Sequence, residues 1–212
     1  GAFALHRARC SGRRAASTGS ACSVPDLARL GTAGLTDLFL GDVYEYDARR
    51  GSAGKAGRAR VEALAPVPRF FDFGGVREFS GRVSTVQCFE NNVILRAALS
   101  EPGHGQVLVV DAAGSMRAAL MGENLGKLAV SNGWAGIVLN GFLRDAAHLQ
   151  KLPLGVKALG TFPVKSGKRE WGARDVTVNF CGATIAPGSY LYSDKDGILV
   201  ADADLLEMAA AC

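Results

Sequence analysis

Short apolar runs alternate with segments of helical spacing through the second half of the chain. Gln106–Asp111 and Ala135–Asn140 are almost wholly apolar, as is typical of strands that are buried on both faces. Between them, Met116–Gly133 carries Met121 and Leu125 at the spacing of an amphipathic helix. Strand, helix and strand in this order predict a parallel or mixed sheet with helices packed on it.

The remaining pattern completes a layered α/β fold. We expect one or two short helices from Val24, capped by Asp26 or Thr32, a helix at Glu90–Leu99 and a closing helix at Asp204–Ala211. Further strands are predicted at Gly81–Gln87, Gly155–Phe162, Val176–Phe180, Ala183–Ala186, Tyr190–Tyr192 and Gly197–Ala201. The prediction is a single α/β domain over residues 24–212, with a mixed sheet and helices on both faces.

Two basic segments stand apart from this pattern. Residues 1–23 are rich in Ala, Arg and Ser and lack acidic residues, which is typical of a mitochondrial leader and equally of an unstructured tail. A second Gly, Ala and basic segment, Gly51–Arg60, lacks apolar periodicity and predicts an exposed loop. We interpret about residues 41–65 as a basic insertion in the domain.

The charge and the hydropathy exclude some functions. The net charge is +4, but outside the two basic clusters 15 basic residues face 20 acidic ones, which argues against a nucleic-acid-binding face on the domain. The basic segment has no interleaved aromatic residues for stacking on bases. The apolar runs are far shorter than the roughly 18 residues of a membrane span. A cytoplasmic or mitochondrial protein is therefore expected.

The five cysteines form no CxxC pair, which argues against a disulfide framework or a zinc site. Cys88 and Cys181 fall in segments predicted as strands and are interpreted as small buried apolar residues. Asp194 and Asp196, in the sequence SDKDG, are interpreted as turn-forming residues rather than metal ligands.

Two turns could form a binding site together. Gly122-Glu123-Asn124-Leu125 lies at or near a predicted helix start, and Gly141–Asp145 follows a buried strand. Ligands of such sheets bind beyond the carboxyl ends of strands and near helix N-termini, where free amides attract carboxylates.

The side chains of these turns suit a small 2-oxo acid. Arg144 offers a permanent cation for a carboxylate or carbonyl oxygen, Asp145 a hard oxygen ligand for Mg²⁺ or Mn²⁺, and Glu123 a second carboxylate for a proton or a metal-bound water. The pattern alone leaves a plainer alternative open, which is a surface Arg-Asp pair at a helix start.

The chain from Phe73 onward resembles the RraA-like family. This family includes 4-hydroxy-4-methyl-2-oxoglutarate aldolases with oxaloacetate decarboxylase activity, and bacterial inhibitors of ribonuclease E. The resemblance rests on four segments in order: Gly74–Asn92, Gln106–Asp145, Gly155–Ser166 and Ser189–Val200. It covers about two thirds of the chain.

The resemblance implies a metal-dependent pyruvate lyase. Family aldolases carry an acidic residue, then twenty residues, then Arg-Asp, and here twenty residues separate Glu123 from Arg144. By resemblance, the backbone of Gly122–Leu125 binds the substrate carboxylate, Arg144 stabilises an enolate oxygen, and Asp145 ligates the metal. The family also implies a trimer or hexamer. His148 departs from the family pattern, because family aldolases often have an acid there.

Two rival functions remain open. The ribonuclease inhibitors of the family typically lack the Asp after the Arg, so Asp145 favours an enzyme over a ribonuclease-binding regulator. A Schiff-base aldolase would need a desolvated lysine on a strand or pocket wall. Lys127 on the predicted helix and Lys165 in a polar turn meet this need poorly.

Overall fold

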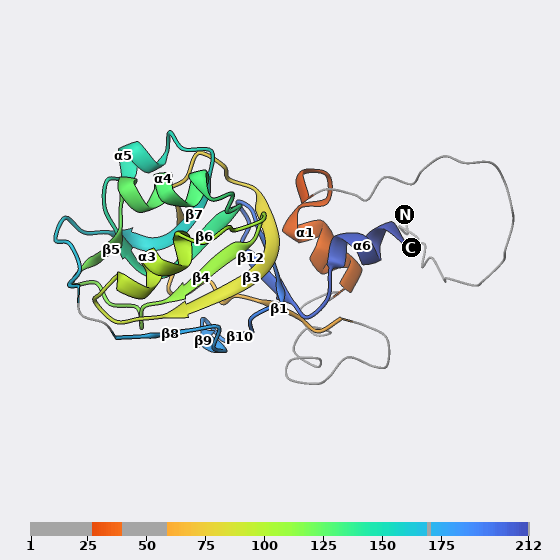
Figure 1. Ribbon diagram of the computed structural model, residues 1–212. Helices are drawn as coiled ribbons and strands as arrows, with labels where there is room; N and C mark the ends of the chain where they lie inside the picture. The colour runs from red at the N-terminus through yellow and green to blue at the C-terminus, as the bar shows by residue number, and fades with distance from the viewer. Residues whose placement is uncertain (1–26, 40–58, 169–170, 212) are drawn as a thin grey trace, which may run out of the picture.

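The computed structural model describes residues 27–39, 59–168 and 171–211 (Figure 1). The helices are α1 (Leu27–Phe39), α3 (Val93–Leu99), α4 (Glu123–Ser131), α5 (Ala146–Leu149) and α6 (Leu205–Ala210). The strands are β1 (Val61–Ala63), β2 (Phe71–Asp72), β3 (Phe79–Gln87), β4 (Val107–Asp111), β5 (Ala119–Met121), β6 (Gly136–Leu143), β7 (Gly155–Thr161), β8 (Ala173–Arg174), β9 (Val178–Phe180), β10 (Ala183–Ile185), β11 (Tyr190–Ser193) and β12 (Ile198–Ala201).

One mixed sheet organises the domain, in the order β1-β12-β11-β3-β4-β6-β7-β2. Its centre is parallel, because β3, β4, β6 and β7 all run in one direction. The flanking strands pair antiparallel, β5 adds in parallel to the end of β6, and β9 and β10 form a separate hairpin. The carboxyl ends of the central strands therefore meet at one edge of the sheet.

Three clusters of buried side chains hold the layers together. On one face of β4 and β6, Leu108, Val110, Ile137 and Leu139 pack with α3, α4 and α5, while Val109 belongs to a cluster on the opposite face. That second cluster is built mainly from strands and includes residues of β9 to β12. The third cluster joins α1 and α6 to the other side of β11 and β12. Helices thus cover two outer sides of the domain, with strands between them (Figure 1).

The predicted fold class is confirmed, and so are most of the predicted elements. Two were wrong around the candidate site: Ala119–Met121 is strand β5 rather than the start of a helix, and Gly141–Leu143 continues β6 rather than forming a turn. The two errors have one cause, because β5 pairs with the end of β6 and so extends that strand.

One further prediction needs correction. Residues 89–92 form a turn, with a positive φ of 51° at Glu90, so the helix predicted from Glu90 begins at Val93. Directly after the segment predicted as an exposed loop, Val61 and Glu62 are buried where β1 pairs with β12 at the edge of the sheet.

The first helix is bent at Gly31, which has a φ of 64°, so it is two short helical segments in continuity. Thr32 begins the second segment but does not cap it with its own side chain. Instead its backbone N–H and its hydroxyl both donate to the carboxylate of Asp194, at 2.6 and 2.8 Å. Oδ1 of Asp194 also accepts from the backbone of Asp196 and Gly197, which confirms its role in the turn.

Some predictions fall on residues outside those described. They are the leader or tail over residues 1–23, the cap at Asp26, and most of the basic insertion. Cys88 is buried as expected, and burial together with the charge of Asp111 raises its pKa to about 12. Cys181 is only half-buried and lies in the turn between β9 and β10, so it is not a strand residue. Within the described ranges, no helix is both long enough and apolar enough to cross a membrane.

Candidate active site

Strand β6 delivers Arg144 and Asp145 to the carboxyl edge of the sheet. Gly136–Gly141 and Leu143 are buried, so the strand is fixed on both faces up to the residue before Arg144. The backbone N–H of Arg144 then donates to the carbonyl oxygen of Met121 at 3.0 Å. Because Met121 ends β5 and α4 begins two residues later, this bond places the Arg-Asp pair beside the start of α4.

The carboxylate of Asp145 contacts that helix start directly. Its Oδ2 accepts a hydrogen bond from the backbone N–H of Glu123 at 3.2 Å and lies 3.7 Å from Nε of Arg144. The remaining N–H groups in the first turn of an α-helix have no partner within the helix. Those of Asn124 and Leu125 therefore add to the positive end of the helix dipole next to the Arg144 cation.

The backbone of Asp145 explains where its carboxylate points. The residue has left-handed dihedral angles, φ 59° and ψ 34°, and precedes α5 without capping it through its side chain. Aspartate and asparagine tolerate this region better than most residues. The carboxylate is therefore directed to the neighbouring helix α4 and not to its own helix.

Glu123 lies at this helix start and is held in its ionised form. A hydrogen bond from Lys127, whose Nζ lies 2.7 Å from Oε1, lowers the pKa of Glu123, and this outweighs the opposing effect of desolvation. The charges of Lys127, His148 and Lys151 lower the pKa further. His148, on the exposed face of α5, is therefore electrostatically coupled to the same site.

The structure thus brings together the residues predicted from sequence. Gly122, Glu123, Arg144 and Asp145 meet at one place, whereas Asn124 is exposed and Leu125 has a buried side chain, so that only its backbone is available. The loop after β7 also lies beside the site, and the sequence did not predict this. The backbone N–H of Phe162 donates to the carbonyl oxygen of Leu143, and that of Ala119 donates to the carbonyl oxygen of Val164.

The donor set fits a weakly held hard cation. Within the described residues no group of three or more His, Cys, Asp or Glu side chains could hold a metal. Mg²⁺, however, is typically held by one or two carboxylates and keeps several waters or substrate oxygens. Asp145 meets this need, because its side chain is 39% exposed and, within the part of the chain described, its Oδ1 accepts no hydrogen bond.

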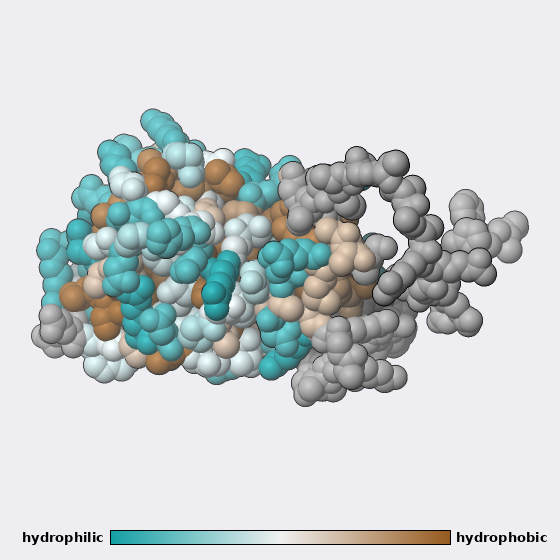
Figure 2. Space-filling view, turned by 45° about the vertical axis from the view of Figure 1, so that its right-hand side comes forward, coloured by the Kyte–Doolittle hydropathy of each residue, from teal (hydrophilic) through white to brown (hydrophobic). Residues whose placement is uncertain are grey.

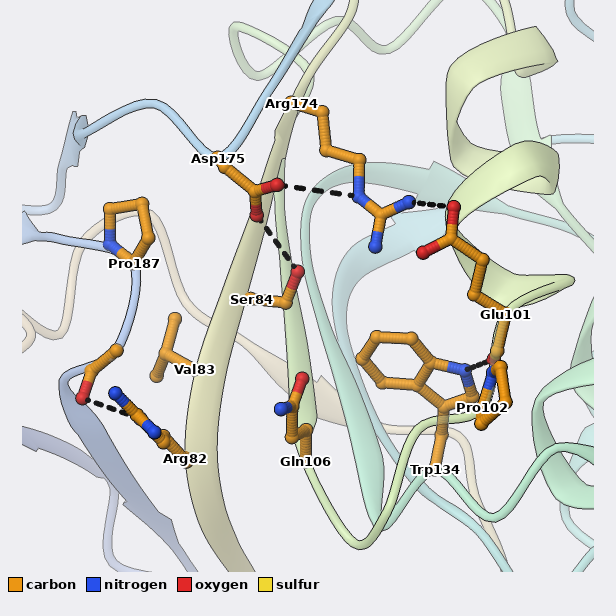
Figure 3. A pocket seen from close by; sticks show the side chains of 11 residues that line it. Arg82, Val83, Ser84, Glu101, Pro102, Gln106, Trp134, Arg174, Asp175 and Pro187 are labelled. Atoms are coloured by element: carbon orange, nitrogen blue, oxygen red, sulfur yellow. Dashed lines mark hydrogen bonds and ion pairs between the residues drawn. The ribbon is translucent and has the colours of Figure 1, made fainter.

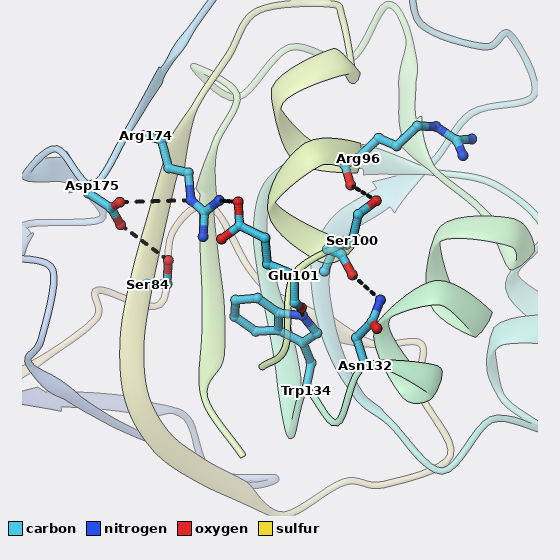
Figure 4. A network of polar contacts seen from close by, with 9 residues as sticks. Ser84, Arg96, Ser100, Glu101, Asn132, Trp134, Arg174 and Asp175 are labelled. Atoms are coloured by element: carbon cyan, nitrogen blue, oxygen red, sulfur yellow. Dashed lines mark hydrogen bonds and ion pairs between the residues drawn. The ribbon is translucent and has the colours of Figure 1, made fainter. Parts of the chain in front are cut away.

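The site is an open edge of the single chain, and the two cavities described lie elsewhere. One, of about 420 Å³, is at the amino ends of the parallel strands, near Ser84, Gln106 and Trp134 (Figure 3). Its Arg174 is paired with Glu101 at 2.6 Å and lies 3.8 Å from Asp175, so its charge is compensated within the protein (Figure 4). Arg174 and Asp175 therefore form a second Arg-Asp pair, but Glu101 binds this arginine, and the aspartate accepts a hydrogen bond from Ser84 rather than from the start of a helix.

Comparison with known proteins relates the whole arrangement to one family. The model of the family described as "RraA-like: Aldolase/RraA" matches residues 42–200. A protein of Alkalilimnicola ehrlichii named "Putative 4-hydroxy-4-methyl-2-oxoglutarate aldolase" is 56% identical over 140 residues, which are 66% of this chain and 87% of that protein. A homologue from Laribacter hongkongensis with the same name is 52% identical over 69% of this chain and 91% of its own length.

A solved structure with the same fold carries a different description. The RNA-processing inhibitor RraA from Thermus thermophilis superposes with a TM-score of 0.64 at 45% identity, covering 66% of this chain and 85% of that one. The fold is thus shared by proteins described as aldolases and by a protein described as an inhibitor, and the residues of the site must distinguish between them.

Proposed function

The chain belongs to the RraA-like family, and we propose that it is a lyase that cleaves carbon–carbon bonds in small 2-oxo acids and releases pyruvate. The substrate is 4-hydroxy-4-methyl-2-oxoglutarate, oxaloacetate or both. One observation carries the proposal: the guanidinium of Arg144 and the carboxylate of Asp145 meet the amino-terminal start of α4 at one edge of the sheet.

The chain's own groups bind and orient the substrate. The amides at the start of α4 and the guanidinium of Arg144 hold the carboxylate of the 2-oxo acid. Asp145 holds a divalent cation, Mg²⁺ or Mn²⁺, which when bound supplies Lewis-acid polarisation of the 2-oxo group. Arg144 also lies where negative charge develops on the former carbonyl oxygen.

The bond change needs stabilisation of an enolate. The bond between C3 and C4 breaks and its electron pair stays on C3, giving the enolate of pyruvate. In the aldol substrate the C4 hydroxyl loses its proton and becomes a carbonyl, whereas oxaloacetate loses carbon dioxide. Arg144 stabilises the enolate oxygen in either case, which is why one site suits both reactions. Ionised Glu123 handles the proton, through water, between the C4 hydroxyl and C3.

A second candidate function is that of a ribonuclease regulator, favoured by the likeness to the Thermus inhibitor. Such a role would need neither a metal nor Asp145. The close approach of the Asp145 carboxylate to the Glu123 amide, which an inhibitory surface would not require, supports the enzyme.

The lysines of the described chain give little support to a Schiff-base mechanism. Lys127 is paired with Glu123, and Lys165 is exposed in the loop after β7. Lys157 is buried, but its Nζ lies 3.0 Å from a carboxylate oxygen of Asp72, in a different cavity.

We also propose that copies of this chain assemble, as a trimer or hexamer, around the open site. Four apolar side chains on loops at the carboxyl edge are about half exposed or more: Phe89 at 46%, Met116 at 66%, Val164 at 55% and Trp171 at 60%. Figure 2 shows one face of the molecule, where brown apolar residues lie among hydrophilic ones and a broader apolar area lies toward the right-hand side. Light scattering coupled to gel filtration tests the assembly.

The decisive experiment measures pyruvate release with a lactate-dehydrogenase-coupled assay. Oxaloacetate and 4-hydroxy-4-methyl-2-oxoglutarate are supplied with EDTA, and then with excess Mg²⁺ or Mn²⁺. We expect EDTA to abolish turnover and the added metal to restore it. We also expect Arg144→Ala to lower turnover by about 100-fold or more while the fold is retained. Wild-type activity in Arg144→Ala, or pyruvate trapping by borohydride, would reject the mechanism. Metal-independent ribonuclease binding without turnover would favour the regulator.

A further inference from the structure

A buried lysine lies outside the proposed lyase site. Lys157, on the apolar strand β7, is only 4% exposed. Its Nζ donates to the carbonyl oxygen of Asp194 at 2.5 Å and lies 3.0 Å from Oδ1 of Asp72. An ammonium group carries three N–H donors, so at least one donor has no partner among these contacts.

The partner carboxylate can also accept a bond from a ligand. Its buried Oδ1 lies 3.0 Å from Nζ of Lys157, whereas the Asp72 side chain as a whole is 28% exposed. An ionised carboxylate accepts at both oxygens, so the second oxygen of Asp72 can accept a hydrogen bond from a bound donor. The two groups together therefore call for a molecule that can both donate and accept a hydrogen bond.

These two side chains line a cavity of about 480 Å³, which is within the range of small-molecule sites. Its apolar lining includes Leu64, Phe70 and Ile198. The ring of Phe70 also packs against that of Phe180, with the ring centroids 6.1 Å apart. An aromatic ring held by a neighbouring ring thus forms part of the cavity wall.

Two cations lie where this cavity opens to solvent. Arg69 and Lys195 are both exposed and both line it. With Lys157 they outnumber the two lining carboxylates, Asp72 and Asp196, so the cavity carries a net positive charge. An anionic group would therefore be held at the opening, while an apolar body lies along the wall.

We propose that this cavity binds a small carboxylate with a flat apolar body and a hydroxyl group at the far end, such as a hydroxylated aromatic acid. The hydroxyl accepts from Lys157 and donates to Asp72, the ring packs on Phe70, and the carboxylate lies between Arg69 and Lys195. No residue of this site belongs to the proposed lyase site, so the inference stands independently of that function.

Isothermal titration calorimetry with three matched probes tests the proposal: 4-hydroxybenzoate, benzoate, and 4-hydroxybenzyl alcohol. We expect saturable binding of 4-hydroxybenzoate, and affinities about tenfold weaker or worse for the probe without the hydroxyl and for the probe without the carboxylate. No saturable binding of 4-hydroxybenzoate, or equal affinity for all three probes, would overturn the proposal.

Variants locate the binding. The double variant Arg69→Ala with Lys195→Ala is expected to bind 4-hydroxybenzoate about tenfold more weakly and the alcohol unchanged. Arg82→Ala removes an exposed cation beside the other cavity and is expected to change neither affinity. Arg144→Ala is expected to bind 4-hydroxybenzoate like the wild type. Loss of binding in Arg144→Ala would place the ligand at the lyase site instead. Wild-type affinity for 4-hydroxybenzoate in the double variant would reject this cavity.

Discussion

A β-carbon at position 122 would lie 2.4 Å from Oδ2 of Asp145, so Gly122 and this carboxylate can be neighbours only because residue 122 has no side chain. The backbone of Gly122 is extended and would suit any residue, with φ −158° and ψ −163°. The requirement for glycine is therefore one of space, and it concerns the candidate site directly.

Gly122→Ala is expected to displace the Asp145 carboxylate and lower turnover by about 100-fold, since small misplacements of catalytic groups have effects of this size. Stability should change by no more than about 1–2 kcal/mol, because the carboxylate is partly exposed and can move. Steady-state kinetics and urea denaturation measure both quantities. Gly197→Ala is the control, because a β-carbon there has nothing within 4 Å. Unchanged turnover in Gly122→Ala would contradict the role of Asp145.

Asp145→Asn separates charge from backbone conformation. Asparagine adopts the left-handed region readily, so the variant should stay within about 1 kcal/mol of wild-type stability. Without the carboxylate charge, the variant should bind Mg²⁺ more weakly, and turnover at sub-saturating Mg²⁺ should fall by about 100-fold. The measurement is kcat/KM against Mg²⁺ concentration, and a variant with the wild-type dependence on Mg²⁺ would disprove ligation by Asp145.

Lys127→Met should raise the pKa of Glu123, because the hydrogen bond from Lys127 is the main cause of its lowering. If ionised Glu123 transfers the proton, the acid limb of kcat/KM against pH then moves to higher pH. Lys151→Met is the matched control, since Lys151 acts through charge alone and should move the limb less. Identical pH profiles in all three proteins would remove Glu123 from the mechanism.

Asp194→Ala tests the turn that supports α1. Burial alone would raise the pKa of Asp194, but hydrogen bonds from Thr32, Asp196 and Gly197 outweigh it and lower the pKa below its usual 3.8. The ionised group therefore stabilises the fold above pH 3.8, and this stabilisation is lost as pH falls through the lowered pKa.

At neutral pH, Asp194→Ala should reduce the free energy of unfolding by about 2–4 kcal/mol, because several donors to a charged acceptor lose their partner. The difference from wild type should shrink as pH falls below 3.8. Denaturant titrations across this pH range measure both effects. A deficit that stays constant down to the lowest pH would show that the carboxylate charge is not the cause.

The central strands could be predicted because their residues are apolar without interruption. Gln106–Asp111 and Ala135–Asn140 contain the strands β4 and most of β6, which are buried on both faces. Strand β5 could not be predicted in this way, because Ala119–Met121 has good helix formers and becomes a strand only through pairing with the end of β6.

The site shows the same limit. The order of helix and strand between the two turns predicted that Glu123, Arg144 and Asp145 would lie at the same edge of the sheet, and they do. The sequence did not indicate that the Asp145 carboxylate would accept a hydrogen bond from the backbone N–H of Glu123. This contact depends on the left-handed backbone conformation of Asp145 and on the space that glycine leaves at position 122. Lys157 was also missed, because a single lysine in an apolar strand gives no sign of whether it is buried or at an edge.

Strand β6 lies between β4 and β7 in the middle of the sheet, and its end carries the Arg-Asp pair. The position of the pair is thus set by the least deformable part of the molecule, whereas the loops at 88–92, 112–118 and 162–168 surround it at the surface. Such a scaffold can acquire a new specificity through substitutions in its loops alone. A single substitution of Asp145 would leave the same framework free to diverge toward a purely regulatory role.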